Sequence, residues 1–255
     1  MRLRQIALVA EELDPVVDDL CAVLGLSVCF NDPGVASFGL HNALMPVNGN
    51  LLEVVAPTRP GTTAGRYLER RGGNGGYMLL FQVDDAADWR ARMADNGVRV
   101  VWETASDTVI ANHFHPQDTP GAIVSIDTML PRQDWHAELA DWLWAGPDWR
   151  AHVRTDCVQA FTAVELQGPD PAALADRWCT LFQRPLTRDA AGRPQILFDN
   201  MALRFVPDDD GRGLGIGAID VLPQDRARAL RAAEARGCRT GPSQVTLCGV
   251  RFNLI

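Results

Sequence analysis

Short apolar runs alternate with helical patterns along the whole chain, and the same order of elements recurs. The run RQIALVA precedes Asp14-Pro15, a pair typical of a helix start, with aspartate as the N-cap and proline in the first turn. Apolar residues from Val16 to Leu24 then recur at helical spacing, and Gly25 ends the pattern. A later segment, AFTAVELQGPDPAALADRWCTLF, repeats the strand, the Asp-Pro pair and the helical spacing.

Two further segments show the same order with a different ending. YMLLFQVDDAADWRARMADNGVRVV and IGAIDVLPQDRARALRAAEARGCRT each run from strand to helix and then pass through a Gly-x-Arg step into another strand. The sequence therefore predicts four strand–helix–strand–strand–strand (βαβββ) modules, at residues 3–57, 76–131, 159–207 and 214–255. Chance alternation in an ordinary α+β chain is the alternative interpretation.

Hairpin strands with interleaved helices build sheets that carry helices on one face, so the predicted fold class is α+β. We expect the modules to pair into a first half, 1–131, and a degenerate second half, 157–255, joined by a linker at 132–156. The linker is rich in tryptophan, and we expect a helix whose indoles dock across both halves, with contact to a ligand as the alternative. Its tryptophans are Trp135, Trp142, Trp144 and Trp149.

Composition excludes several classes of function. All 24 Lys+Arg residues are arginine, which excludes Schiff-base catalysis and phosphate-binding loops that need lysine. The six cysteines are scattered without a CxxC pair, a pattern typical of reduced, packed thiols. A net charge of −8 disfavours a nucleic-acid partner, and no apolar run is long enough to span a membrane. We expect a soluble, cytoplasmic protein.

The segment HFHPQDTPGAIVSID holds two of the five histidines, His113 and His115. Residues two apart on a strand share one face, so both imidazoles could reach one ligand or metal ion. A cupin-type metal motif is rejected, because Pro116 follows at once and helical units flank the segment. The alternatives are a metal site and a hairpin that happens to carry histidines.

Three segments, QIALVAEELDPVV, GLHNALMPVNGNLLEVVAP and HPQDTPGAIVSID, resemble the vicinal oxygen chelate superfamily and its glyoxalase-like branch. The last is similar to the HPKDTGG-x-x-x-E ending of methylmalonyl-CoA epimerases. The resemblance implies glyoxalase-like curled mixed sheets with helices outside. It also implies a cavity in which a divalent metal is held by one residue from the first strand and one from the last strand of each module, binding vicinal oxygens of a substrate.

Carried over position by position, the family's metal ligands fall in the first half on Gln5 and Glu53, and then on Met78 and Ser125. The first pair can ligate a divalent ion, whereas a thioether and a serine hydroxyl are poor ligands. In the second half the positions fall on Phe161, on Leu203 or Arg204, on Ile216 and on Asn253. The standard metal site is therefore expected to be incomplete.

Two hypotheses about metal and catalysis remain open. A divalent metal is one, held by Gln5 and Glu53 with His113 or His115 as substitute ligands. Alternatively, Glu53 acts as a general base without metal, if burial raises its pKa, or it is simply hydrogen-bonded to Gln5 or an arginine.

A pocket is the other expected feature of the first half. Its candidate lining residues are His41, His113, His115, Met78 and Ser125. The histidines have a structural alternative, which is to bond backbone groups around the turn.

The leading functional hypothesis is an enzyme acting on a small oxygen-rich metabolite, of the lyase, isomerase or dioxygenase kind, with Gln5 and Glu53 at its centre. The rival is a non-catalytic binding or sequestering protein of the bleomycin-resistance kind, with a pocket lined by histidines and linker tryptophans. Either way the expected partner is a small molecule, and the protein is expected to be a monomer or homodimer.

Overall fold

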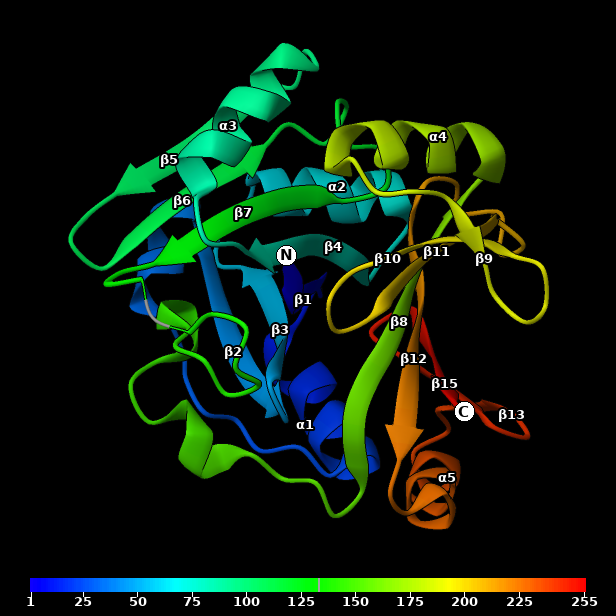
Figure 1. Ribbon diagram of the computed structural model, residues 1–255. Coiled ribbons are helices and arrows are strands. Elements are labelled where there is room, and N and C mark those ends of the chain that lie inside the picture. The colour runs from blue at the N-terminus through cyan, green and yellow to red at the C-terminus, as the bar shows by residue number, and fades with distance from the viewer. Residues whose placement is uncertain (133) are drawn as a thin grey trace.

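The first half of the chain builds a seven-stranded sheet in the order β2-β3-β1-β4-β7-β6-β5 (Figure 1). The computed structural model describes residues 1–132 and 134–255. The strands of this sheet are β1 (Arg2–Val9), β2 (Leu40–Val47), β3 (Asn50–Pro57), β4 (Gly75–Gln82), β5 (Val100–Ala105), β6 (Val109–Phe114) and β7 (Ile123–Met129).

The second half builds an eight-stranded sheet in the order β13-β14-β15-β12-β8-β11-β10-β9. Its strands are β8 (Val158–Gly168), β9 (Thr187–Arg188), β10 (Pro194–Leu197), β11 (Ala202–Pro207), β12 (Gly215–Pro223), β13 (Arg239–Gly241), β14 (Gln244–Leu247) and β15 (Val250–Leu254). The helices are α1 (Leu13–Leu24), α2 (Thr63–Arg71), α3 (Ala86–Asp95), α4 (Pro171–Phe182) and α5 (Arg226–Ala235). None of the described helices is long and apolar enough to cross a membrane.

Strand pairing repeats between the halves. In the first sheet β1 pairs parallel with β3 and antiparallel with β4, which pairs parallel with β7. In the second sheet β8, β11, β12 and β15 make the same three pairings. The predicted α+β fold of repeated modules is confirmed, but the first module has one strand fewer, with the 3-10 helix η1 (Pro33–Phe38) between α1 and β2.

The Asp-Pro pairs begin their helices differently. Asp170 is the predicted N-cap of α4, and its side chain accepts a hydrogen bond from the Ala173 N–H at 3.0 Å. At α1 the prediction is wrong, because Glu12 is the N-cap and Asp14 lies inside the first turn. There the carboxylate stabilises the positive end of the helix without a direct cap.

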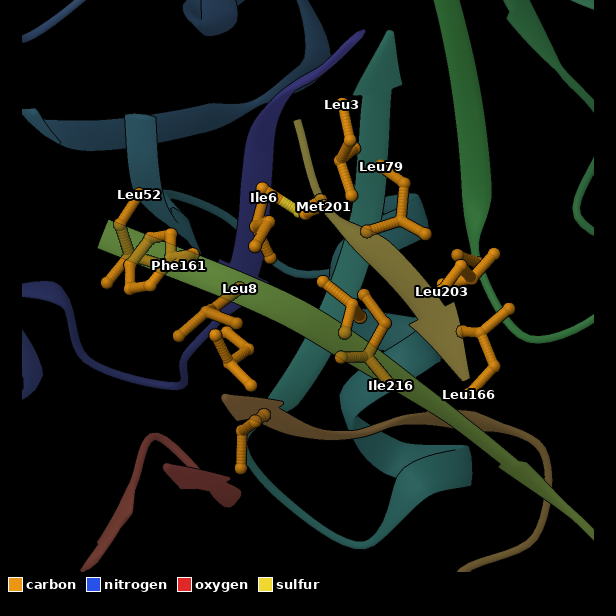
Figure 2. Packing of buried hydrophobic residues seen from close by; sticks show 14 of the residues in the cluster. Leu3, Ile6, Leu8, Leu52, Leu79, Phe161, Leu166, Met201, Leu203 and Ile216 are labelled. Carbon is orange, nitrogen blue, oxygen red and sulfur yellow. The ribbon is translucent and has the colours of Figure 1, made fainter. Parts of the chain in front are cut away.

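The two sheets share one apolar core, into which α1, α3, α4 and α5 also pack. Figure 2 shows Ile6 and Leu8 of β1 near Phe161 of the second half, and all three belong to the same buried cluster as Leu3 and Ile216. Because neighbouring residues on a strand face opposite ways, Gln5 and Ala7 must lie on the other face of the first sheet. We call this face, which lies away from the shared core, the concave face.

Gly76 lies at a close approach of the two halves. A Cβ built at Gly76 would lie 2.3 Å from the Cβ of Ile216 on β12. We expect Gly76→Ala to destabilise the protein by about 1–3 kcal/mol, because the tightly packed core must shift to make room. Urea unfolding measures this loss, and an unchanged midpoint would contradict it.

The predicted linker helix is wrong. The described part of the linker contains only two short 3-10 turns, η2 (Leu143–Ala145) and η3 (Trp149–His152). Side chains bind all six successive backbone carbonyls of residues 136–141, and only the Ala137 carbonyl also accepts a described backbone N–H of the linker, from Ala140. Arg2 binds the carbonyls of His136 and Ala137, and Arg4 binds those of Glu138 and Ala140. Arg150 binds the Leu139 carbonyl, and Gln82 binds the Asp141 carbonyl.

Candidate functional site

Gln5 and Glu53 meet on the concave face of the first sheet. Gln5 Nε2 donates to Glu53 Oε2 at 2.8 Å, and Asn42 Nδ2 donates to Oε1 at 2.6 Å. Burial raises the pKa of Glu53, and the two amide donors offset part of that shift. The structure thus brings together the two residues that the sequence placed at the centre of the site, as a hydrogen-bonded pair.

The linker also contacts Gln5 on the concave face. Trp142, buried against the concave face, donates its indole N–H to Gln5 Oε1 at 2.7 Å. It packs with Ala7, Leu51 and Leu80, which form the floor of this face. The polar atoms of Gln5 and both oxygens of Glu53 are therefore already bonded within the protein.

Ser125 stands where the repeat places the counterpart of Glu53. Glu53 lies opposite Ala7 on β1, and Ser125 lies opposite Leu80 on β4 in the same parallel pairing. The carboxyl group of this module is two residues further along β7, at Asp127, on the same face. Sequence reasoning missed Asp127, although an acidic residue in the apolar run IVSIDTM was a signal for it.

Asp127 is fully buried and held by two neutral donors. Ser125 Oγ donates to Oδ1 at 2.5 Å, and Trp144 Nε1 of the linker donates to Oδ2 at 2.8 Å. Burial raises the pKa of Asp127 to about 7, against the opposing effect of these hydrogen bonds. A carboxyl group in this state is poised to gain or lose a proton near neutral pH.

The three histidines predicted to line the pocket lie at different places in the structure. His113 lies opposite Ser125 on β6, and its ring packs on Trp102 with 4.4 Å between centroids. Burial lowers the pKa of His113 to about 4, so it is neutral at pH 7. His41 is exposed and next to Asn42 on β2, so it faces away from Glu53. His115 lies in the turn after β6, where its Nδ1 accepts the Gln117 N–H at 3.1 Å.

The arrangement does not fit a divalent metal. Among residues 1–132 and 134–255 no three His, Cys, Asp or Glu side chains are grouped as metal ligands. Amide N–H groups occupy both oxygens of Glu53, and the matching positions of the second module hold Met78, which is half-buried, and Ser125, which is buried. We therefore derive no step through a metal ion.

In the second half an arginine replaces the acidic residue. Glu165 on β8 lies opposite Arg204 on β11, so Arg204 is the counterpart of Glu53, which resolves the ambiguity with its neighbour Leu203. Arg204 Nη1 lies 2.7 Å from Glu165 Oε1 and 2.9 Å from Asp220 Oδ2. Burial alone would lower the pKa of Arg204, but Asp220 and Glu165 outweigh it and raise the pKa.

The first-strand positions expected in the second half are wrong by two residues. The pairing of β8 with β12 matches that of β1 with β4 only when Ala163 and Ala218, not Phe161 and Ile216, take those places. For Phe161 the error comes from matching the two Asp-Pro pairs, which begin their helices two residues out of step. Asn253, opposite Asp220 as expected, is the fourth position.

The two halves treat buried acids differently. Glu165 and Asp220 pair with Arg204, whereas no arginine among the described residues contacts Glu53 or Asp127. Burying a carboxyl without a cation is costly, and such groups concentrate at functional sites. The first half is therefore the better candidate for function.

A cleft of about 360 Å³ opens beside the linker in the first half. Trp142 forms one wall, so the cleft lies directly behind the residue that bonds Gln5. Its other lining residues are Phe30, Thr108, Met129, Leu130, Asp141, Leu143, Gly146, Pro147, Trp149 and Arg150. The volume is within the range of small-molecule sites.

Paired βαβββ modules with a polar centre on the concave face define the glyoxalase-like class, within the vicinal oxygen chelate superfamily. The family model for the glyoxalase-like domain matches residues 6–182, well over half of the chain. The chain belongs to this family. No curated protein is significantly similar in sequence.

Solved structures share the fold. A hypothetical protein from Staphylococcus aureus matches 99% of this chain and 97% of its own, with 11% identity and a TM-score of 0.64. Methylmalonyl-CoA epimerases cover about half of this chain. The Streptomyces coelicolor enzyme, in complex with 2-nitronate-propionyl-CoA, matches 51% of this chain and 98% of its own at 25% identity, with a TM-score of 0.46. The Mycobacterium tuberculosis enzyme matches 51% and 88% at 24% identity, with a TM-score of 0.45.

Proposed function

We propose that the protein binds a small organic molecule in the cleft beside the linker, without a metal ion. The observation that carries the proposal is the cleft of about 360 Å³, lined largely by apolar and aromatic side chains. Leu143 at this cleft is 45% exposed, an apolar surface that a ligand would cover. The linker tryptophans then serve a ligand as well as the fold.

The polar groups of the concave face support the choice of this cleft, because they already form hydrogen bonds with the linker. Trp142 binds Gln5 and Trp144 binds Asp127, so the linker lies where a ligand would have to reach these groups. Arg4 and Gln82 hold the neighbouring linker carbonyls, which makes displacement of the linker costly. The ligand site is therefore the cleft beside the linker, and not the space between the linker and the concave face.

Binding of 2-naphthol, a neutral aromatic probe, tests the proposal by calorimetry and tryptophan fluorescence. We expect saturable binding that EDTA does not change. Leu143→Arg should weaken binding at least tenfold, because a charged chain at the cleft opposes an apolar ligand. Leu222→Arg is the matched control, since Leu222 is 40% exposed on β12 of the other half. Equal binding by both variants would contradict the proposal.

A second candidate function is proton transfer without metal, of the isomerase or lyase kind. The observation that favours it is Asp127, whose pKa of about 7 suits a general acid or base. Glu53 lies on the same face, with β1 and β4 between β3 and β7. A substrate would have to displace Trp144 from Asp127 to reach it.

Deuterium uptake from D₂O tests this candidate. The probes are 2-oxo acids and hydroxyketones, and ¹H NMR follows the carbon next to the carbonyl. Exchange above the buffer rate that disappears in Asp127→Asn but persists in Asp107→Asn, at an exposed residue of the β5–β6 turn, would support it. Exchange that persists in both variants would exclude Asp127 as the group responsible.

A further inference from the structure

Arg150 gives the cleft one charged donor with a defined orientation. Its Nε donates to the Leu139 carbonyl at 2.9 Å, and its Nη2 lies 2.6 Å from Asp141 Oδ1. The guanidinium carbon lies 4.9 Å from the centre of the Trp149 ring, so the fork is also stacked on an aromatic face. Two of its three nitrogens are thus fixed by neighbours.

The third nitrogen is the one available to a ligand. Across the described ranges, 1–132 and 134–255, Nη1 of Arg150 has no hydrogen-bond partner. Arginine holds carboxylates through its planar N–H fork, and a fork that is already fixed loses little freedom on binding. The cleft therefore combines an apolar interior with one preorientated cationic donor.

We propose that the ligand of this cleft is a small aromatic carboxylate. Its ring lies against Trp142, Trp149 and the apolar lining, and its carboxylate accepts from Arg150 Nη1. This inference rests on the proposed binding function and adds the chemical class of the ligand. The aromatic lining favours a flat ring, because aromatic rings gain stacking or edge contacts beyond simple area burial.

The carboxylate of Asp141, which also lines the cleft, does not make the cleft prefer a cationic ligand. Its side chain is 56% exposed, and one of its oxygens is engaged by Arg150, so the pair is close to neutral. Arg150 is 39% exposed, so water screens its charge as well, but its N–H groups can only donate. An anionic ligand oxygen can replace water as their acceptor in a charge-assisted hydrogen bond, whereas a cationic ligand cannot.

Three probes of the same ring separate the charge of the ligand from its shape. We expect 2-naphthoate to bind about tenfold tighter than 2-naphthamide at pH 7.5, and 2-naphthylmethylamine to bind more weakly than the amide. Arg150→Met should remove the advantage of the acid and leave the amide unchanged. Arg154→Met is the control, because Arg154 is exposed and is not among the cleft residues.

A measurement on the unaltered protein guards against a variant that disturbs the linker. Raising the salt concentration should weaken the binding of naphthoate and leave naphthamide unaffected, since only the former depends on charge. Equal affinity for acid and amide, or a preference for the amine, would overturn the ligand class and leave the binding function standing. If none of the three probes binds, both proposals fail.

Discussion

Replacing Asp127 by asparagine is expected to stabilise the protein at pH 8, and to do so less at pH 5. Burial raises the pKa of this carboxyl to about 7, while the unfolded chain titrates near its ordinary value of 3.8. Asparagine keeps the geometry, because its Oδ1 can accept from Trp144 and its Nδ2 can donate to Ser125 Oγ. The variant therefore removes the charge without removing the hydrogen bonds.

The direction follows from proton binding. Between pH 4 and pH 7 the folded state holds the Asp127 proton and the unfolded state has released it, so the folded state binds more protons. Stability from this group is complete below the unfolded pKa and falls as the pH rises to the folded pKa. Between pH 5 and pH 8 the advantage of Asp127→Asn should grow by roughly 2–3 kcal/mol.

Urea unfolding at the two pH values measures this difference. Titration of the neutral His113 and of Glu53, on the same face, affects both proteins and largely cancels in the comparison. Asp107→Asn, at an exposed turn residue, should change stability by less than about 0.5 kcal/mol at either pH. An advantage that is equal at pH 5 and pH 8 would show that Asp127 is ionised in the folded protein.

Replacing Arg204 by methionine is expected to destabilise the protein by about 3–5 kcal/mol, because it leaves buried carboxylates without their main cation. Arg204 contacts Glu165, Asp220 and Asp189, the last at 3.0 Å from its Nε. For a chain of this size the loss corresponds to a fall of roughly 10 °C in Tm. Calorimetry or chemical unfolding of the purified variant measures it.

Two comparisons separate the burial of charge from the loss of a contact. Arg193 binds the same Glu165 at 3.0 Å, but its side chain is 43% exposed, so Arg193→Met should cost about 1 kcal/mol or less. Adding Glu165→Gln and Asp220→Asn to Arg204→Met should recover most of the stability, since no buried charge then lacks a partner. No recovery would mean that Arg204 acts through packing.

The repeat was readable because it depends on local signals. Helical spacing, alternation and turn residues recur in each module, and each is a short-range property. Gln5 and Glu53 were found through the resemblance to the glyoxalase-like family, whose ligand positions fall on them, and the parallel pairing of β1 with β3 places both on one face. Ser125 was placed as the counterpart of Glu53 through the same resemblance.

The predictions from sequence were wrong where a shift of one residue, or a contact between distant residues, changes the face or the partner of a side chain. His41 is a single position from Asn42, yet strand alternation sends it to the opposite face. In the second half, strand pairing places the counterparts of the ligand positions at Ala163 and Ala218, two residues from Phe161 and Ile216. Register depends on how two strands pair, so neither strand alone reveals it.

By itself the sequence determined the repeated modules and the α+β class, which follow from periodicity. Its resemblance to the glyoxalase-like family predicted that Gln5 and Glu53 would lie together. Tertiary structure alone decided that the described part of the linker is irregular, that Trp142 and Trp144 bind the polar groups of the concave face, and that a cleft remains behind them. These depend on contacts across more than a hundred residues, such as Arg4 with the carbonyls of Glu138 and Ala140, which no local pattern specifies.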